Sequence, residues 1–443
     1  MRPRLCRMWV VWAGAALLPA GCSDAFNAGP PRYVEQERLT TDFKDKPVLQ
    51  GKVRAALAKH FGDAPNEIKV PEGSGLPLGG AYLANYVKQG DAVKSIAYVP
   101  ATPTSGSSDP QPVEGGYGLY RKHCLHCHGV SGAGDGPTSS FLYPRPRDYR
   151  KGLFKFTSTP TGAKPTRSDL RKTIEYGLHG TSMPAFEALM SKAEIEQVID
   201  YVIFLSLRGE SELSLIDEAS TSDEKDPEAL SEDVVKDIIQ SVAKKWQAAE
   251  SLVMNPPTPR VEPTHASVMR GRELFLGLNK TGNKVECAGC HGPQAVGNGP
   301  TFVAQEVFNH IVFGGNPSAM PERVAELEKS DPKAYELWKT SLDEWGNPLR
   351  PANLNRGIYK GGRRPLDIYW RIAKGINGAK MPSHFPTLEP DKIWDLVNFV
   401  LELPYEPKLL EGAKLPEALP AAKTAGNAAP TASESIARGQ GGL

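Results

Sequence analysis

The sequence has few cysteines and almost no net charge. Its 443 residues include six cysteines, and 52 lysines and arginines balance 51 aspartates and glutamates, for a net charge of +1. So small a net charge gives no electrostatic reason to expect nucleic-acid binding. Beyond residues 8–20, no segment is apolar enough to cross a membrane, which takes about 20 consecutive apolar residues. The hydrophobic content of 40% is ordinary, which argues against an extended disordered chain.

The N-terminus has the pattern of a secretory signal peptide. Three arginines in the first seven residues precede an apolar run over residues 8–20, which is too short to span a bilayer comfortably. The run ends in LPAGC at residues 18–22, which resembles the lipobox of bacterial lipoproteins, with proline where an aliphatic residue is more usual. We expect a signal peptide over residues 1–21 and a lipid on Cys22. The alternative is ordinary cleavage near Gly21, which leaves a free thiol.

The four remaining cysteines beyond Cys22 form two copies of one motif, CLHCH at residues 124–128 and CAGCH at residues 287–291. Two cysteines separated by two residues and followed at once by histidine are the attachment pattern of a c-type haem. Each thiol adds across one porphyrin vinyl group, and the adjacent histidine can then ligate the iron. A zinc knuckle or a redox dithiol is the alternative, but neither requires this histidine. The motifs predict two covalent haem c groups, attached through Cys124, Cys127, Cys287 and Cys290, with His128 and His291 as axial ligands. Each histidine is expected to bind iron through Nε2 and to donate Nδ1–H to a backbone carbonyl. Candidate acceptors are Pro144 or Pro146 in the first domain and Pro351 in the second.

The residues around the two motifs also repeat. Gly116, Leu119 and Tyr120 before the first motif correspond to Gly271, Leu274 and Phe275 before the second. A glycine-rich loop follows each motif, and the pattern I-x-x-G-x-x-G-x-x-M-P occurs at residues 174–184 and 372–382. Self-similarity of this kind indicates a duplication.

The repeated pattern places one methionine at the same position in each copy, at Met183 and Met381. The following proline fixes φ and helps to hold a loop that presents the thioether. We therefore predict these methionines as the sixth iron ligands, although most methionines are simply core residues. Met320-Pro321 shows the same dipeptide without the glycine frame. Histidine and methionine together fill both axial positions and raise the reduction potential, which favours the transfer of single electrons.

The chain is predicted to be all-α, with two tandem haem domains, a helical and proline-rich connector, and a small non-haem N-terminal region. Amphipathic patterns predict a last helix over residues 192–207 in the first domain and its counterpart in the second. The predicted units are the signal peptide 1–21, the N-terminal region and linker 22–112, the first domain 113–208, the connector 209–265, the second domain 266–405 with an insertion at 302–345, and a disordered tail 406–443.

Two basic clusters flank the predicted sites. The first holds Arg145, Arg147, Arg150, Lys151 and Lys155, and the second holds Arg356, Lys360, Arg363 and Arg364. They could pair with haem propionates or steer an acidic redox partner, or they could form an ordinary solvated surface.

Together these residues resemble the class I cytochromes c. The resemblance covers both haem domains: the helix before each CxxCH motif, the Gly-Pro loop, the Met-Pro segment and the last amphipathic helix. It implies the small all-α cytochrome c fold, in which helices wrap the haem. By the same resemblance, membrane-tethered dihaem cytochromes of this kind serve as electron-transfer subunits of bacterial respiratory chains.

The leading hypothesis is a lipid-anchored electron carrier, or a cytochrome subunit of a larger complex, on the periplasmic side of a bacterial membrane. Its partners would be a reductase, an oxidase or a dehydrogenase, and it would not itself be an enzyme. Two other classes remain: a dihaem peroxidase, which needs one displaceable sixth ligand, and a haem-based sensor, for which no output domain is recognisable.

Overall fold

The computed structural model describes residues 31–65, 67–76, 86–89, 92–95, 115–278, 285 and 287–415. The predicted signal peptide, Cys22 and the whole of the 101–112 linker region lie outside the described residues. The helices are α2 (Glu37–Thr41), α3 (Pro47–Phe61), α5 (Gly116–His123), α6 (Leu125–His128), α7 (Arg167–Tyr176), α8 (Lys192–Thr221), α9 (Glu232–Ala248), α10 (His265–Leu276), α11 (Ala288–His291), α12 (Gln305–Phe313), α13 (Met320–Ser330), α14 (Pro332–Thr340), α15 (Pro365–Lys374) and α16 (Pro390–Glu402).

Helices dominate the described residues, as the sequence predicts for an all-α fold. One antiparallel hairpin joins β1 (Tyr86–Gln89) to β2 (Ala92–Ser95). Short 3-10 turns lie at Ser139–Phe141, Ala249–Leu252, Pro317–Ala319, Leu354–Arg356 and Pro407–Leu410. Within the described ranges, no helix is both long enough and apolar enough to cross a bilayer.

Each predicted haem domain is built on a crossing of its first and last helices. Helix α5 packs on α8, and α10 packs on α16. A Cβ atom on Gly116 of α5 would lie 2.5 Å from the carbonyl oxygen of Gln197, and one on Gly271 of α10 would lie 2.2 Å from that of Asp395. Only glycine allows the backbones to approach this closely. The matched glycines of the sequence repeat therefore mark the same crossing in both domains.

Helix α8 is longer than its sequence pattern predicts. It begins with a capping box between Ser191 and Glu194, and it continues past the expected end at residue 207 as far as Thr221. The reason is a second packing surface: Leu215, Ile216 and Ala219 are fully buried, on a helix that also packs against α3. The first part of the predicted connector, 209–221, is thus a helical extension of the first domain.

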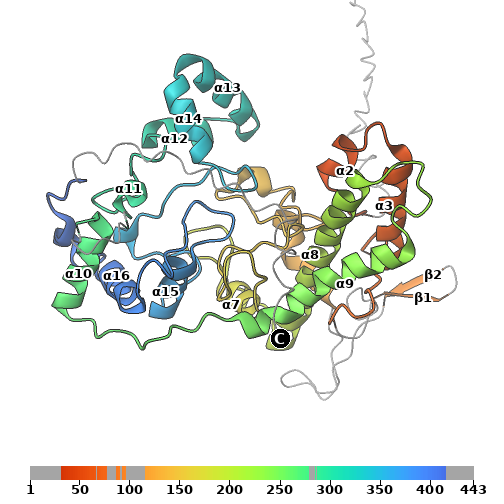
Figure 1. Cartoon of the computed structure of the whole chain (residues 1–443), viewed down its shortest axis with the longest axis horizontal. Helices are drawn as coiled ribbons and strands as arrows, with labels where there is room; N and C mark the ends of the chain where they lie inside the picture. The colour runs from red at the N-terminus through yellow and green to blue at the C-terminus, as the bar shows by residue number, and fades with distance from the viewer. Residues whose placement is uncertain are drawn as a thin grey trace, which may run out of the picture.

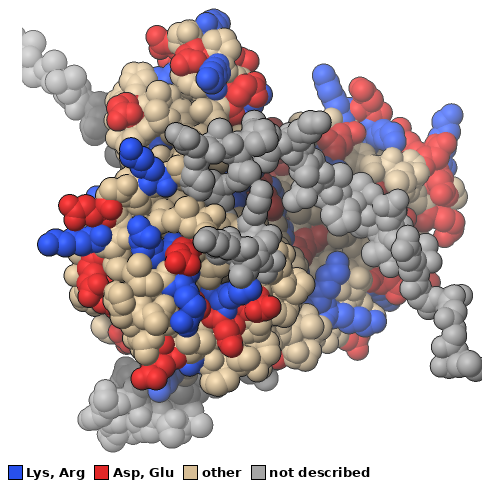
Figure 2. Space-filling view, turned by 60° about the vertical axis from the view of Figure 1, so that its left-hand side comes forward, with Lys and Arg blue, Asp and Glu red and all other residues tan. Residues whose placement is uncertain are grey.

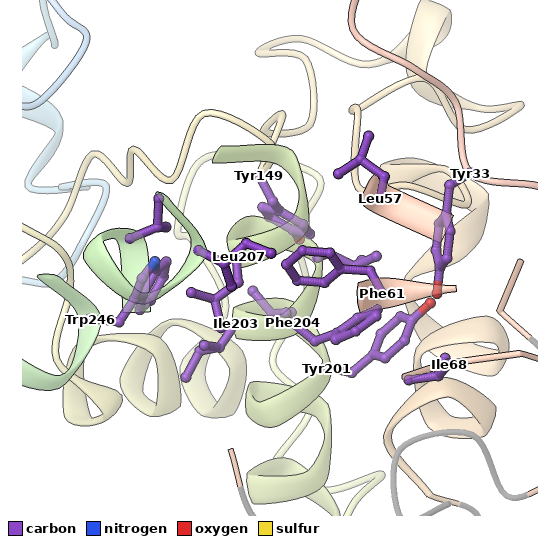
Figure 3. Packing of buried hydrophobic residues seen from close by; sticks show 14 of the residues in the cluster. Tyr33, Leu57, Phe61, Ile68, Tyr149, Tyr201, Ile203, Phe204, Leu207 and Trp246 are labelled. Atoms are coloured by element: carbon purple, nitrogen blue, oxygen red, sulfur yellow. The ribbon is translucent and has the colours of Figure 1, made fainter. Parts of the chain in front are cut away.

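The described N-terminal residues share a core with the first domain. Tyr33 and Phe61 pack against Phe204 of α8, with ring centroids 6.3 and 5.9 Å apart, and Figure 3 shows these rings together with Trp246 of α9. The backbone N–H of Gln36 donates to the buried Glu212 carboxylate at 2.8 Å. The expectation that this region and the connector are separate units is therefore wrong for these residues. In Figure 1, α2, α3, α8 and α9 lie together on one side.

The insertion forms a small helical unit of its own. Helices α12, α13 and α14 project from the second domain in Figure 1, around a core of Val303, Phe308, Ile311 and Trp338. Tyr143 of the first domain contacts this unit, with its ring 5.8 Å from that of Phe308. The insertion therefore touches both domains.

The predicted disordered tail is ordered at its start. Residues 407–410 form a 3-10 turn, and Leu410 and Ala413 are buried against the core of the second domain. The prediction of disorder from residue 406 is thus wrong as far as residue 415, and residues 416–443 lie outside the described part of the chain.

Candidate haem sites

Both CxxCH motifs end in the same turn, with the same hydrogen bonds to the loop that follows. In each, a short helix carries the second cysteine and the histidine and ends at a glycine with positive φ, Gly129 or Gly292. The glycine-rich loop then folds back on the motif. The N–H of Gly134 donates to the carbonyl of His128 at 2.9 Å, and the N–H of Gly297 donates to that of His291 at 2.8 Å. The loop therefore closes over the backbone of each predicted iron ligand.

Each predicted proximal histidine is oriented by one backbone carbonyl. His128 Nδ1 lies 3.1 Å from the carbonyl oxygen of Arg147, and His291 Nδ1 lies 3.0 Å from that of Ala352. A carbonyl only accepts, so Nδ1 carries the proton and Nε2 is left to bind a metal. Burial, with a smaller contribution from the Arg147 charge, lowers the pKa of His128 to about 4. The imidazole is therefore neutral at pH 7.

The sequence suggested prolines as these acceptors: Pro144 or Pro146 in the first domain and Pro351 in the second. The structure places the acceptor one residue after Pro146 and one after Pro351. The two proline carbonyls face the glycine loop instead: a Cβ on Gly134 would lie 2.6 Å from the oxygen of Pro146, and one on Gly297 would lie 2.4 Å from that of Pro351. The next carbonyl along the chain is then the one that meets the imidazole.

Aromatic rings and threonines, which sequence reasoning did not single out, complete the surroundings of the motifs. The Tyr149 ring stacks on His128, with centroids 4.6 Å apart and planes at 22°. The hydroxyl of Thr138 lies 3.4 Å from Cys127 Sγ, and that of Thr301 lies 3.3 Å from Cys290 Sγ. These two threonines occupy the same position after each motif, a repeat that the sequence comparison could have found.

The two methionine segments are also built alike. The N–H of Leu178 donates to the carbonyl of Met183 at 3.1 Å, and the N–H of Ile376 donates to that of Met381 at the same distance. Both methionines are half-buried and line the same cavity as the histidines. Met320 instead packs against the core of the insertion.

One continuous cavity of about 1100 Å³ joins the two sites. All four cysteines, both histidines and both methionines of the predicted ligand set line it. Its volume exceeds the ~300–1,000 Å³ of a usual single-ligand pocket, and its walls are mainly apolar with convergent histidine and thioether donors. These residues fit two haem groups. Among the described residues, no cluster of three or more His, Cys, Asp or Glu side chains is placed to hold a bare metal ion.

Part of the first predicted basic cluster lies in the contact between the domains. Lys155 donates to the buried Asp343 of the insertion at 2.9 Å, and Arg364 and Lys172 both donate to Asp367. Over the described part of the face in Figure 2, acidic and basic side chains are interspersed. Of the alternatives for the clusters, a solvated surface fails for Lys155, whose side chain is 17% exposed, whereas the side chain of Arg364 stays 64% exposed.

Several of these cations also line the cavity and could hold haem propionates. Burial lowers the pKa of Lys155 to about 8 and that of Arg371 to about 10. Arg371, which lies outside the two clusters, donates to the carbonyls of Lys360 and Gly362, at 2.6 and 2.7 Å. A haem propionate close to such a cation would offset the free-energy cost of burying the cation.

One comparison with known proteins covers the segment that contains the first CxxCH motif. Residues 111–202 match the family model of the cytochrome c oxidase, cbb3-type, subunit III. The match gives a cytochrome c domain over this segment; it supports a c-type cytochrome and implies covalently bound haem c there. The second CxxCH motif lies beyond the matched residues. No curated protein matches the chain.

Among solved structures, a chain of the reducing HAO-like protein complex from Kuenenia stuttgartiensis is similar, with 23% sequence identity and a TM-score of 0.42. The similarity covers 69% of the present chain and 99% of the other.

Proposed function

We propose that the chain is a dihaem cytochrome c, which passes single electrons between respiratory redox partners as a carrier or as a cytochrome subunit of a larger complex. The observation that carries this proposal is the single cavity lined by both CxxCH motifs, both histidines and both methionines. The match of residues 111–202 to a subunit family of a terminal oxidase supports a role of this kind for the first domain.

The residues have distinct roles in this proposal. Cys124 and Cys127 would hold one haem, and Cys287 and Cys290 would hold the other, through thioether bonds. His128 and His291 would each bind iron through Nε2, while Met183 and Met381 would occupy the opposite axial positions. When bound, a haem iron with both axial positions filled accepts and gives up one electron without an open site for peroxide or oxygen.

The protein's own part in this function is to hold the ligands in place and to exclude water. The carbonyls of Arg147 and Ala352 fix the ring orientation of the two histidines, and such hydrogen bonds raise the basicity of a ligating imidazole. Tyr149 and Phe275 cover the two rings. Because one cavity serves both sites, the two domains act as a relay rather than as two separate carriers.

The location of the protein follows from the N-terminal pattern. We propose that Cys22 carries a lipid that tethers the protein to the periplasmic side of a bacterial membrane. The partners are redox proteins that approach from the same compartment: a reductase or dehydrogenase that supplies electrons, and an oxidase that receives them.

The experiment that tests the proposed function compares the haem-loaded chain with its Met183→Ala and Met381→Ala variants. We expect two haems per chain by pyridine haemochrome assay and mass spectrometry. Ferric haem with His/Met ligation has a weak far-red absorption band, and each variant should lose about half of it. A variant that leaves the band unchanged, or a wild-type haem that is high-spin and binds carbon monoxide, would contradict the proposed ligand set and favour catalysis or gas sensing.

A further inference from the structure

The second domain reaches the first through a short turn at the end of the insertion, residues 343–347. Asp343 Oδ1 accepts hydrogen bonds from the backbone N–H groups of Trp345 and Asn347, at 3.0 and 2.9 Å. Its other carboxylate oxygen accepts from Lys155 of the first domain at 2.9 Å, and the Asp343 side chain is only 3% exposed. The turn is therefore closed on itself and anchored to the first domain.

Trp345, within this turn, contacts the residue that orients the first histidine. The guanidinium carbon of Arg147 lies 3.6 Å from the centroid of the indole ring, a distance at which a cation and an aromatic face attract. The backbone carbonyl of the same arginine accepts the hydrogen bond from His128 Nδ1. The indole ring thus contacts the side chain of Arg147, and the backbone carbonyl of Arg147 orients His128.

The benzene edge of the same indole packs against the methionine segment of the second domain. A Cβ atom on Gly378 would lie 2.1 Å from the Trp345 ring, so the ring fills space that only glycine leaves open. The backbone N–H of Glu344 also donates to the carbonyl of Gly378 at 3.0 Å. Gly378 lies three residues before Met381, in the loop that presents the thioether.

The ring is held by packing and charge and not by its N–H group. Trp345 Nε1 is buried and has no hydrogen-bond partner among the described residues. The amino groups of Lys151 and Lys155 lie 5.8 and 5.9 Å from the ring centroid, alongside Arg147. A phenyl ring at this position would keep an aromatic face for the cations but would not reach as far toward Gly378, because the contacting atoms belong to the outer edge of the indole.

We propose that Trp345 is a positioning residue for both iron sites. It fixes Arg147, which orients His128, and it supports the loop that carries Met381, so a displacement at one site is transmitted to the other through a single side chain. This inference rests on the proposed function, in which His128 and Met381 ligate two different haems.

The test uses the haem-loaded full chain with Trp345→Ala and Trp345→Phe, and with Trp338→Ala as the matched control. Trp338 is a buried tryptophan of the same insertion, 2% exposed, and it packs on Phe308. Spectroelectrochemical titration gives the two midpoint potentials, which the Met183→Ala and Met381→Ala variants assign to their haems.

We expect Trp345→Ala to shift the midpoint potential of the haem at His128 and to remove the Met381 share of the far-red band, about half of the total. Trp345→Phe should restore the potential of the haem at His128 and only part of the Met381 share of the band, because a phenyl ring keeps a face for Arg147 but is shorter toward Gly378. Trp338→Ala should lower the thermal midpoint of unfolding and leave both signals at their wild-type values. If Trp345→Ala leaves the potential of the haem at His128 unchanged, the inference is wrong.

A second pair of variants covers the case in which Trp345→Ala does not fold. Gly378→Ala pushes a methyl group into the buried indole. Gly180→Ala places one at the matched position of the first domain, 3.1 Å from the exposed side chain of Ile358 in the second domain, which is free to move aside. Both glycines have positive φ, 68° and 75°, so the backbone strain is matched. We expect Gly378→Ala to shift the potentials of both haems and Gly180→Ala to shift only that of its own domain.

If Gly378→Ala shifts only the haem of the second domain, the proposed coupling is absent. A wild-type chain without two haems or without a far-red band would overturn the proposed function itself, and with it the inference. If the wild-type chain has two haems and a far-red band, but the Trp345 and Gly378 variants change neither the potentials nor the band, the inference is overturned and the proposed function stands.

Discussion

Gly116 and Gln197 meet where the first and last helices of the first domain cross, so closely that a Cβ on the glycine would lie 2.5 Å from the glutamine carbonyl oxygen. Gly271 and Asp395 meet in the same way in the second domain. Neither glycine has a positive φ, so the backbone conformation itself would accept alanine. Glycine is required because the helices leave no space for a Cβ atom.

We therefore expect Gly116→Ala and Gly271→Ala to lower the free energy of unfolding by about 1–3 kcal/mol each through overpacking. Gly51→Ala is the matched control, because Gly51 lies inside α3 with nothing within 4 Å of its would-be Cβ. That substitution should raise stability by about 0.5–1 kcal/mol through helix propensity. Denaturant titration of the three variants measures these differences, and equal effects at all three positions would contradict the account of the crossings.

A second prediction concerns acid pH and the contact between the domains. Burial alone would raise the pKa of Asp367, but hydrogen bonds from Arg364 and Lys172, together with their charges, lower it below its ordinary value of 3.8. A carboxyl group with a lowered pKa stabilises the folded state above pH 3.8, and this stabilisation is lost as the pH falls through the lowered value. The ion pair with Lys172 joins the two domains.

We expect Asp367→Asn to cost about 1–3 kcal/mol of stability at pH 7, since it removes hydrogen bonds to charged partners. The difference from wild type should shrink as the pH falls below 3.8. Asp42→Asn, which breaks the exposed pair with Arg38, should have no measurable effect. Urea titration at a series of pH values gives the comparison, and a pH-independent difference for Asp367→Asn would contradict the electrostatic explanation.

The third prediction addresses the membrane tether. We expect Cys22→Ser to move the protein from the membrane fraction to the soluble periplasmic fraction, because acyl chains supply about 0.8 kcal/mol of membrane affinity per buried CH₂ group. Fractionation and intact mass of the mature chain report the change. Cys6→Ser is the control, since Cys6 lies in the predicted signal peptide. A wild-type chain without added lipid mass would rule out the anchor.

The sequence was most informative where chemistry and backbone geometry are both encoded locally. The CxxCH motifs, the glycines at the helix crossings and the Met-Pro segments could be aligned by spacing alone, and the structure brings the motifs and the Met-Pro segments around one cavity. The hydrogen-bond acceptors of His128 and His291 were predicted less well. They are backbone carbonyls, and which carbonyl faces inward depends on how the chain passes the glycine loop.

Features that depend on distant partners could not be predicted. The acidic stretch after residue 208 gave no reason to extend α8 in the prediction. The buried face of α8 is completed by N-terminal residues such as Phe61 and Tyr33, which are distant in the sequence. Lys155 was expected in a basic surface cluster, but its partner Asp343 lies 188 residues further along the chain. Charge patterns show where cations lie in the sequence and not which of them meet a buried carboxylate.

The central claim, that the chain is a two-haem relay in one cavity, is tested most directly by intramolecular electron transfer. The haem-loaded chain is reduced by a flash with less than one electron per molecule, and the redistribution of the electron between the two haems is followed optically. The account predicts a first-order redistribution with a rate that does not depend on protein concentration. A redistribution that is absent, or whose rate rises in proportion to protein concentration, would show that the two haems exchange electrons only between molecules and would contradict the relay.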